Sequence, residues 1–181
     1  MDDTIRDYLD YAALEKSLSR ATISAYSTDL ASAAEWFADR GTGLPDADAR
    51  SIAEFAASLG GSGFSPSSVR RKLSVLRGYF DYLASEGLRA DNPVEGTVSV
   101  KIPDRLPDVL SPVAAAALVE AFDGTTAVST RNRAMLELAY GCGLRESEVT
   151  GLTTDRLSLE ESTVRPLGKG GRERLLPLGG P

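Results

Sequence analysis

The segment from Ser65 to Gly87 constrains the fold of this chain more than any other stretch. Its large apolar side chains recur every three or four residues, which places them on one stripe of an α-helix: Val69, Leu73, Leu76, Phe80 and Leu83. Ser65 followed by Pro66 is a favoured start for a helix, and Gly87 is a typical stop. This region therefore predicts a long amphipathic helix that must pack its apolar stripe against other elements.

Three further segments before Ser65 show the same helical period. The first is carried by Ile5, Tyr8, Leu9, Ala12 and Ala13, and the second begins near Ser19, carries Ile23, Tyr26, Leu30 and Phe37, and ends at Gly41. The third has Asp48 as its expected N-cap, buries Ile52, Phe55 and Ala56, and ends at Gly60. Residues 1–92 are therefore expected to form a four-helix domain.

The composition changes after residue 92. The stretch NPVEGTVSVKIPDRLP contains three prolines and no helical period, so residues 93–107 are interpreted as an interdomain linker. Helical patterns resume at Ser111-Pro112, over Arg133–Tyr140 and after Gly143. Two β-prone runs, STVRPL and RERLLPL, then surround a glycine-rich turn, which predicts a β-hairpin within residues 108–181.

The composition excludes several classes of protein. Apolar residues make up 42% of the 181 residues and charged residues 25%, as in globular domains. No apolar run approaches the ~20 residues that a membrane span requires, and the acidic N-terminus does not resemble a signal peptide, so a cytoplasmic protein without a membrane partner is expected. The chain has one cysteine and no histidine, which argues against a disulfide and against metal sites built on histidine or several cysteines.

The expected helix over 65–87 carries a basic face opposite its apolar stripe. Ser67, Arg70, Arg71, Ser74 and Arg77 project from this face, and no acidic residue occurs between Pro66 and Phe80. Such a face is either a solvated surface or a surface that binds DNA phosphates and base edges. Arg20 and Thr22, at the start of the second helix, are candidates for the same surface. The net charge of −6 does not decide between the two, because residues 1–65 alone carry 5 basic and 11 acidic side chains.

Two cationic residues near the C-terminus stand in unusual surroundings. Arg145 follows a Gly-Cys-Gly turn in YGCGLRESEVTGL, with Glu148 three residues later on the same helical face. Lys169 lies in the turn GKGG, followed by Arg172 and Arg174. Arg145 is either half of a structural ion pair or a cation positioned for phosphate, and Lys169 is either a surface residue or a functional one. A nucleotide-binding P-loop is a poor explanation for Lys169, because Gly170 follows it where a P-loop has serine or threonine.

Four segments, taken in order, resemble the tyrosine site-specific recombinases, particularly the bacterial Xer type (XerC/XerD-like). They are SLSRATISAYSTDL, SPSSVRRKLSVLRGYFDYLASEGLRADNP, YGCGLRESEVTGL and TVRPLGKGGRERLLPLG. The resemblance implies a mainly α fold: a four-helix SAM-like core-binding domain over residues 1–92, a linker over 93–107, and the start of a mixed α+β catalytic domain with a β-hairpin over 108–181.

The same resemblance implies roles for individual residues. Arg145 would be the first catalytic arginine, Glu148 its supporting carboxylate and Lys169 the hairpin lysine. DNA contacts are expected from the basic face and its neighbours: Arg20, Thr22, Ser67, Arg70, Arg71, Ser74, Arg77, Arg172 and Arg174. The family cleaves DNA through a phosphotyrosine intermediate and requires neither a metal nor a cofactor. Its partners would be double-stranded DNA with inverted half-sites and a second recombinase protomer, in a homo- or hetero-tetramer.

The main departure of the sequence from the family pattern concerns the residues that should follow the hairpin. The family's His-x-x-Arg pair and nucleophilic tyrosine should follow the hairpin, but the chain has no histidine and its last tyrosine is Tyr140. The 181 residues are therefore expected to be inactive in cleavage and to represent a truncated recombinase, with chromosome-dimer resolution as the expected role. A phage or mobile-element integrase, a non-catalytic DNA-binding module and a helical protein-interaction module are the alternatives.

Overall fold

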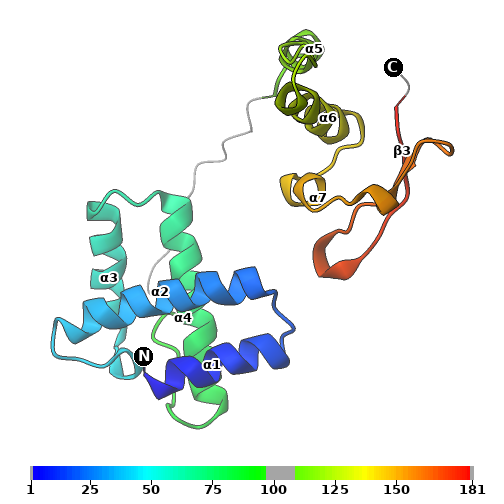
Figure 1. Cartoon of the computed structure of the whole chain (residues 1–181). Coiled ribbons are helices and arrows are strands. Elements are labelled where there is room, and N and C mark those ends of the chain that lie inside the picture. The colour runs from blue at the N-terminus through cyan, green and yellow to red at the C-terminus, as the bar shows by residue number, and fades with distance from the viewer. Residues whose placement is uncertain (1, 97–108, 180–181) are drawn as a thin grey trace. The chain divides into compact units, whose positions relative to one another are not determined.

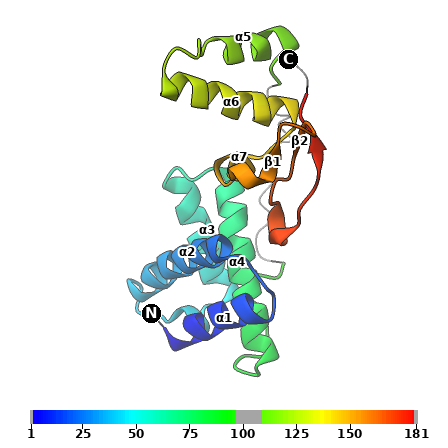
Figure 2. The same ribbon diagram turned by 45° about the vertical axis from the view of Figure 1, so that its right-hand side comes forward.

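The computed structural model describes residues 2–96 and 109–179. The chain divides into two compact units, Met1–Arg105 (unit 1) and Leu106–Pro181 (unit 2), which are described separately here (Figures 1 and 2). Most of the expected linker, residues 93–107, lies outside the described residues. In its first part, Val94 is buried in the core of unit 1.

Unit 1 contains the four expected helices. They are α1 (Asp3–Leu14), α2 (Arg20–Ala38), α3 (Ala49–Gly61) and α4 (Pro66–Ser85), with a short 3-10 helix η1 (Leu44–Asp46) between α2 and α3 that the sequence pattern did not predict. The predicted caps are confirmed: the side chain of Asp48 accepts a hydrogen bond from Ser51 N, and that of Ser65 accepts one from Ser68 N. These caps satisfy backbone donors that a helix start leaves without partners.

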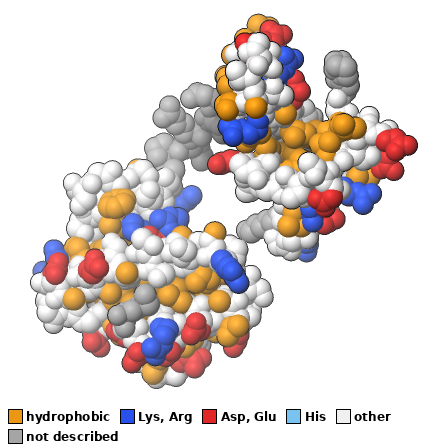
Figure 3. Space-filling view, in the orientation of Figure 1, with side chains coloured by type: hydrophobic (Ala, Val, Ile, Leu, Met, Phe, Trp, Pro, Cys, Tyr) orange, Lys and Arg blue, Asp and Glu red, His pale blue; other side chains and the backbone are white. Residues whose placement is uncertain are grey.

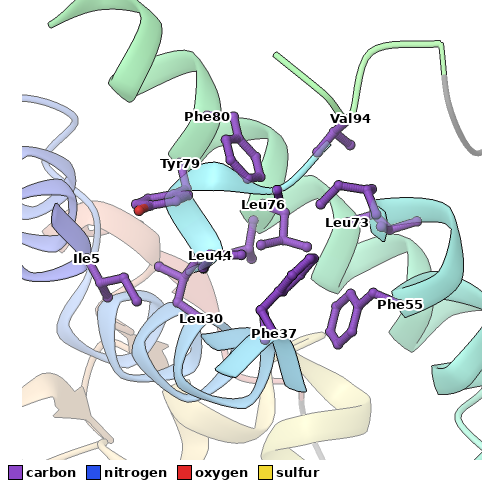
Figure 4. Close-up of a cluster of buried hydrophobic side chains, with 14 of the residues drawn as sticks. Ile5, Leu30, Phe37, Leu44, Phe55, Leu73, Leu76, Tyr79, Phe80 and Val94 are labelled. Carbon is purple, nitrogen blue, oxygen red and sulfur yellow. The ribbon is translucent and has the colours of Figure 1, made fainter. Parts of the chain in front are cut away.

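Helix α4 lies at the centre of unit 1 and packs against α1, α2 and α3. Its apolar stripe meets aromatic and aliphatic side chains from every other helix, as Figure 4 shows for part of the cluster. The largest fully buried side chains are Tyr79, Phe37, Phe55, Phe80, Ile5, Leu30, Leu44, Ile52, Leu76 and Leu83. The predicted stripe is therefore confirmed, and α4 is the element on which the fold of unit 1 depends.

Unit 2 begins with three helices: α5 (Pro112–Glu120), α6 (Ala127–Gly141) and the short α7 (Glu146–Thr150). Figures 1 and 2 both place α5 beside α6. The helix expected over Arg133–Tyr140 is longer in the structure, because α6 already starts at Ala127, with Thr126 as its N-cap. None of the helices in the described parts of the chain is long and apolar enough to cross a membrane.

The rest of unit 2 is a small antiparallel sheet with the order β1-β2-β3. After the 3-10 helix η2 (Thr154–Arg156) come β1 (Leu157–Ser158) and β2 (Thr163–Val164), and β3 (Leu176–Pro177) follows the 3-10 turn η3 (Lys169–Gly171). Val164 pairs with Leu157 on one side and Leu176 on the other. The predicted hairpin is β2–β3, and β1 is a third strand that the sequence pattern missed.

Unit 2 buries few apolar side chains within the described residues. Ala115, Leu144 and Val164 are its buried hydrophobic residues, and α6 has no buried residue at all. Several large apolar side chains are exposed instead: Val109, Leu110, Val113, Leu118, Val128, Tyr140, Leu159, Leu167 and Leu175. Figure 3 accordingly shows a broad apolar area on the visible face of unit 2.

A glycine on α4 gives a direct test of the packing in unit 1. A Cβ at Gly78 would lie 2.6 Å from the Tyr8 hydroxyl oxygen, whereas a Cβ at Gly60, near the end of α3, would meet nothing within 4 Å. Overpacking costs ~1–3 kcal/mol and exceeds the ~0.5–1 kcal/mol that alanine gains over glycine in a helix. We expect Gly78→Ala to lower the free energy of unfolding of unit 1 by about 1 kcal/mol.

The matched control is Gly60→Ala, which should leave that free energy unchanged or raise it by roughly 0.5 kcal/mol. Urea unfolding followed by the fluorescence of Trp36 measures both, because the chain has a single tryptophan and it packs against the core of unit 1. Equal, stabilising effects of the two substitutions would contradict the close approach of α1 and α4 at Gly78.

Candidate functional site

The first candidate site is the exposed face of α4. Ser67, Arg70, Arg71, Ser74 and Arg77 are all exposed, as the helical pattern predicts. Figure 3 shows basic side chains gathered beside the N-terminal half of this helix. Arg70 and Arg77 make no side-chain hydrogen bond or ion pair with any residue in the described parts of the chain. Their guanidinium groups are therefore available to an anionic ligand.

Arg71 differs from these two arginines, because it pairs with a buried carboxylate on α2. Both of its terminal nitrogens donate to Asp29, with Nη2 3.1 Å from Oδ1 and Nη1 in contact with Oδ2. Lys72 Nζ donates to the same Oδ1 at 2.9 Å. Asp29 and Lys72 are both buried, whereas the Arg71 side chain is 51% exposed. Sequence reasoning missed Asp29, although an acid on the apolar face of the second helix was a visible anomaly.

The two candidates at the start of α2 differ in their surroundings. Arg20 is exposed, but the Thr22 hydroxyl lies 2.9 Å from that of Ser19 and takes part in the helix cap. Arg20 also borders a groove of about 480 Å³ between α1 and α2, whose rim carries Arg6 and Asp10. The groove mixes charges of both signs and has an apolar floor, so it does not extend the basic face.

The second candidate site lies at the start of α7 and presents Arg145. Gly143 adopts a left-handed conformation (φ 60°), which turns the chain after α6, and Leu144 is buried directly after it. Arg145 then occupies the N-cap position, and its side chain is 71% exposed. The turn and the buried leucine therefore fix the backbone of a residue whose guanidinium faces solvent.

Glu148 is the buried centre of this site. Its Oε2 accepts a hydrogen bond from Arg145 N at 2.9 Å, and its Oε1 lies 3.1 Å from Arg145 Nη1. Arg174 adds a bidentate pair, with Nη1 2.6 Å from Oε1 and Nη2 2.8 Å from Oε2. The hydrogen bonds from the Arg174 side chain, followed by that from the Arg145 amide, lower the pKa of Glu148 from 4.5 to about 2. The carboxylate is therefore ionised at neutral pH and raises the pKa of Arg174 in turn.

Arg174 has a structural partner that the sequence did not reveal. Its guanidinium holds Glu148 and is about one third exposed, and its expected contact with DNA stays a prediction. Arg172 is exposed on the same hairpin, while Glu173 pairs with Arg156 at 2.7 Å. Glu148 was expected to support Arg145 alone, and the spacing of the sequence gave no indication that an arginine 26 residues away would share it.

Lys169 lies in η3, the turn that connects β2 to β3. Its side chain is outside the described residues, so its expected role stays a prediction. The neighbouring backbone is tightly packed: a Cβ at Gly168 would lie 3.2 Å from Arg172 O and 3.4 Å from Glu148 Oε1. Glycine at 168 thus lets the end of the hairpin approach the Arg145–Glu148 pair.

The charges of this second site suit an anion. Arg145, Glu148 and Arg174 sum to one positive charge, and the least covered of the three side chains is Arg145. A guanidinium with a fixed orientation can bind two phosphate oxygens at once. Within residues 2–96 and 109–179, no group of three or more histidine, cysteine, aspartate or glutamate side chains could hold a metal ion.

Comparison with protein families decides what this arrangement belongs to. The model of the phage integrase N-terminal SAM-like domain matches residues 5–87, and the model of the phage integrase family matches residues 109–180. The chain belongs to the phage integrase family. The two matches fall on units 1 and 2 respectively, so the family assignment covers both candidate sites.

Xer-type tyrosine recombinases are among the curated relatives of the chain. Tyrosine recombinase XerD of Vibrio cholerae serotype O1 is 38% identical over 175 residues, covering 97% of this chain and 58% of the relative. Tyrosine recombinase XerD of Pseudomonas putida is 41% identical over 178 residues, covering 97% of this chain and 59% of the relative. The chain therefore spans about three fifths of the length of these relatives and is a Xer-type sequence of the phage integrase family.

Solved structures show the same fold at low sequence identity. The Tn1549 transposon integrase in complex with circular intermediate DNA has a TM-score of 0.71 at 19% identity, covering 97% of this chain and 60% of that chain. The XerH site-specific recombinase bound to palindromic difH substrate has a TM-score of 0.68 at 22% identity, covering 94% of this chain and 51% of the XerH chain. The fold expected from the sequence is therefore confirmed, including the SAM-like unit 1 and the helix-plus-sheet unit 2.

The ion pairs of Glu148 imply that the stability of the hairpin in unit 2 depends on pH. A carboxyl group with a lowered pKa stabilises the folded state above its unfolded pKa, and this stabilisation is lost as protons bind. We expect the order of the hairpin around Gly168 to weaken as the pH falls from about 4.5 toward 2. Amide chemical shifts of Gly168 and Arg145, followed by NMR over this range, measure the transition.

The matched variants are Glu148→Gln and Glu146→Gln, which each remove one carboxylate from α7. Glu146 is exposed and makes no side-chain hydrogen bond or ion pair with the residues that the structure describes. Glu148→Gln should remove the transition and perturb both amides already at neutral pH, whereas Glu146→Gln should leave both unchanged. The same transition in both variants would show that another group causes it.

Proposed function

We propose that this chain binds duplex DNA through the exposed face of α4 and orients a DNA phosphate with Arg145, as part of a site-specific recombinase. The observation that carries the proposal is the basic face of α4, which has no acidic residue between Pro66 and Phe80. It combines exposed arginines and serines along one side of a helix whose other side is fully committed to the core. The Xer-type relatives and the family matches support the same reading.

The shape and chemistry of α4 suit a DNA groove. An α-helix fits the major groove, where arginine reads guanine and serine hydroxyls reach phosphates or bases. Arg70 and Arg77 lie seven residues apart on the same face and have no acidic partner in the described parts of the chain. A solvated helix surface usually mixes charges of both signs to form i,i+4 pairs, as Arg50 and Glu54 do on α3.

In unit 2, we propose that Arg145 binds the non-bridging oxygens of the phosphate at which recombination occurs. Cleavage by a tyrosine hydroxyl passes through a pentavalent phosphorane with additional negative charge on these oxygens. A guanidinium that Glu148 already orients stabilises this charge without reorganisation during the reaction. Glu148 is buried and contacts Arg145 and Arg174, so its proposed role is positioning.

Lys169 would act as the general acid that protonates the departing 5′ oxygen. The attacking tyrosine would leave a 3′-phosphotyrosyl bond that conserves the energy for strand exchange. All six tyrosines of the chain, Tyr8, Tyr11, Tyr26, Tyr79, Tyr82 and Tyr140, lie in α1, α2, α4 and α6, before Arg145. We therefore propose DNA binding and phosphate orientation for these 181 residues, and no strand cleavage by them alone.

The proposal extends to the DNA and to the assembly. The XerH structure is a complex with a palindromic substrate, and a lambda integrase tetramer has been solved on a Holliday junction. By analogy with these proteins, we propose a DNA site with inverted half-sites and a second recombinase protomer as partners. Chromosome-dimer resolution, in the cytoplasm, is the proposed role, in line with the XerD relatives.

Arg70→Ala combined with Arg77→Ala tests the α4 face. Each lost phosphate contact should lower the slope of log affinity against log salt by about 0.9. We expect the double variant to bind duplex DNA more weakly at low salt and with a slope reduced by up to about two. Fluorescence anisotropy of a labelled duplex, titrated with the 181-residue chain over a salt series, measures both quantities.

Arg6→Ala combined with Arg50→Ala is the matched control. It removes the same charge from exposed helix positions of unit 1, where each arginine pairs with an acid on its own helix. It should change the binding of DNA little, and so should Arg145→Ala, whose proposed contact matters in the transition state. If Arg145→Ala abolished binding while the α4 double variant had no effect, the DNA-facing surface would be wrongly placed.

A further inference from the structure

The pairing of Arg71 with Asp29 separates this arginine from the other arginines of α4. Asp29 is 4% exposed and receives hydrogen bonds from two cations, Arg71 and Lys72. Lys72 is itself buried, with its side chain 8% exposed. A buried carboxylate with one buried cation would already be neutralised, so the bidentate bond to the half-exposed Arg71 is an additional constraint on that side chain.

The geometry leaves Arg71 with hydrogen-bonding capacity toward solvent. A guanidinium has five N–H donors, and Asp29 takes one from Nη1 and one from Nη2. The N–H of Nε and one further N–H on each terminal nitrogen remain, which is three donors. Nε and the adjacent terminal nitrogen form a second fork, of the kind that binds two acceptors side by side. The side chain is 51% exposed, so this edge is open to a ligand.

Arg70 and Arg77 lack such an anchor in the described residues and keep their rotamer freedom. A free arginine can follow a phosphate wherever the DNA backbone places it, which gives affinity without sequence information. A fixed arginine presents its donors in one direction and loses little entropy on binding. It therefore distinguishes a correctly placed pair of acceptors, such as guanine O6 and N7, from an incorrectly placed one.

We propose that Asp29 is a positioning residue that fixes Arg71 as the base-reading side chain of α4. Arg71 then supplies sequence preference, while Arg70 and Arg77 supply affinity that is largely independent of sequence. Lys72 holds the Asp29 carboxylate in place from the buried side. This inference rests on the proposed DNA binding by α4, and it adds that the arginines of α4 have different roles in that binding.

The test begins with selection of duplexes by the 181-residue chain from a pool with randomised positions. The dissociation constants for the selected duplex and for a shuffled duplex of equal composition are then measured by anisotropy over a salt series. The dissociation constant for the shuffled duplex divided by that for the selected duplex (the ratio) reports sequence preference. The constant for the shuffled duplex alone reports non-specific affinity. Thermal unfolding of every variant, followed by Trp36 fluorescence, verifies that unit 1 is folded.

Arg71→Lys keeps the charge but removes the fork. We expect it to lower the ratio roughly tenfold or more and to leave the affinity for the shuffled duplex nearly unchanged. Asp29→Leu combined with Lys72→Met removes both acceptors of the anchor without leaving a buried charge unpaired, and it should lower the ratio similarly although Arg71 is intact. The control Arg70→Ala should weaken binding to both duplexes by the same factor and leave the ratio unchanged.

Several outcomes would overturn the proposal. If Arg71→Lys left the ratio intact, the Arg71–Asp29 pair would be purely structural. If only Arg71→Lys lowered it and the anchor variant did not, Arg71 would read bases without positioning by Asp29. A chain that binds all duplexes equally would refute base reading while preserving the proposed DNA binding. No binding to any duplex at low salt would instead refute the proposed function itself.

Discussion

Helix α4 carries the centre of the core of unit 1 on one side and the basic face on the other. One side supplies Val69, Leu73, Leu76, Tyr79 and Phe80 to a core shared with three other helices, and burial of such residues is the main source of stability in a domain of this size. The other side keeps arginines in water: Arg70 and Arg77 pair with no acid of α4, and Asp81, four residues after Arg77, accepts a hydrogen bond from Asn92 instead. Because the core fixes the rotation of α4, it also fixes the direction in which the basic face points.

A buried carboxylate that holds two cations occurs in both units. In unit 1, Asp29 binds Arg71 and Lys72, and in unit 2, Glu148 binds Arg145 and Arg174. Each cluster sums to one positive charge and presents one arginine that is at least half exposed. A buried ion pair contributes little net stability, because desolvation offsets the attraction between the charges. Its consequence here is geometric: it fixes the direction of a guanidinium that faces solvent.

The sequence pattern predicted what depends on local periodicity and failed on what depends on distant contacts. The helices of unit 1 and their caps at Asp48 and Ser65 follow from residues a few positions apart. The hairpin was predictable because glycines separate two β-prone runs, but the two-residue strand β1 is too short to show a period. The pairing of Arg174 with Glu148 spans 26 residues, and no spacing rule in the sequence identifies which of the hairpin arginines will form it.

The small apolar core of unit 2 explains why its site depends on polar contacts. Leu144 and Val164 are the large hydrophobic side chains that are buried among its described residues, so packing alone does not hold α7 against the hairpin. The connection instead passes through Glu148, which binds the Arg145 amide in its own helix and both terminal nitrogens of Arg174 on the hairpin. The close approach at Gly168 allows this connection. The relative position of Arg145 and the turn that contains Lys169 is therefore set by one carboxylate, whose charge is maintained by the two arginines that it orients.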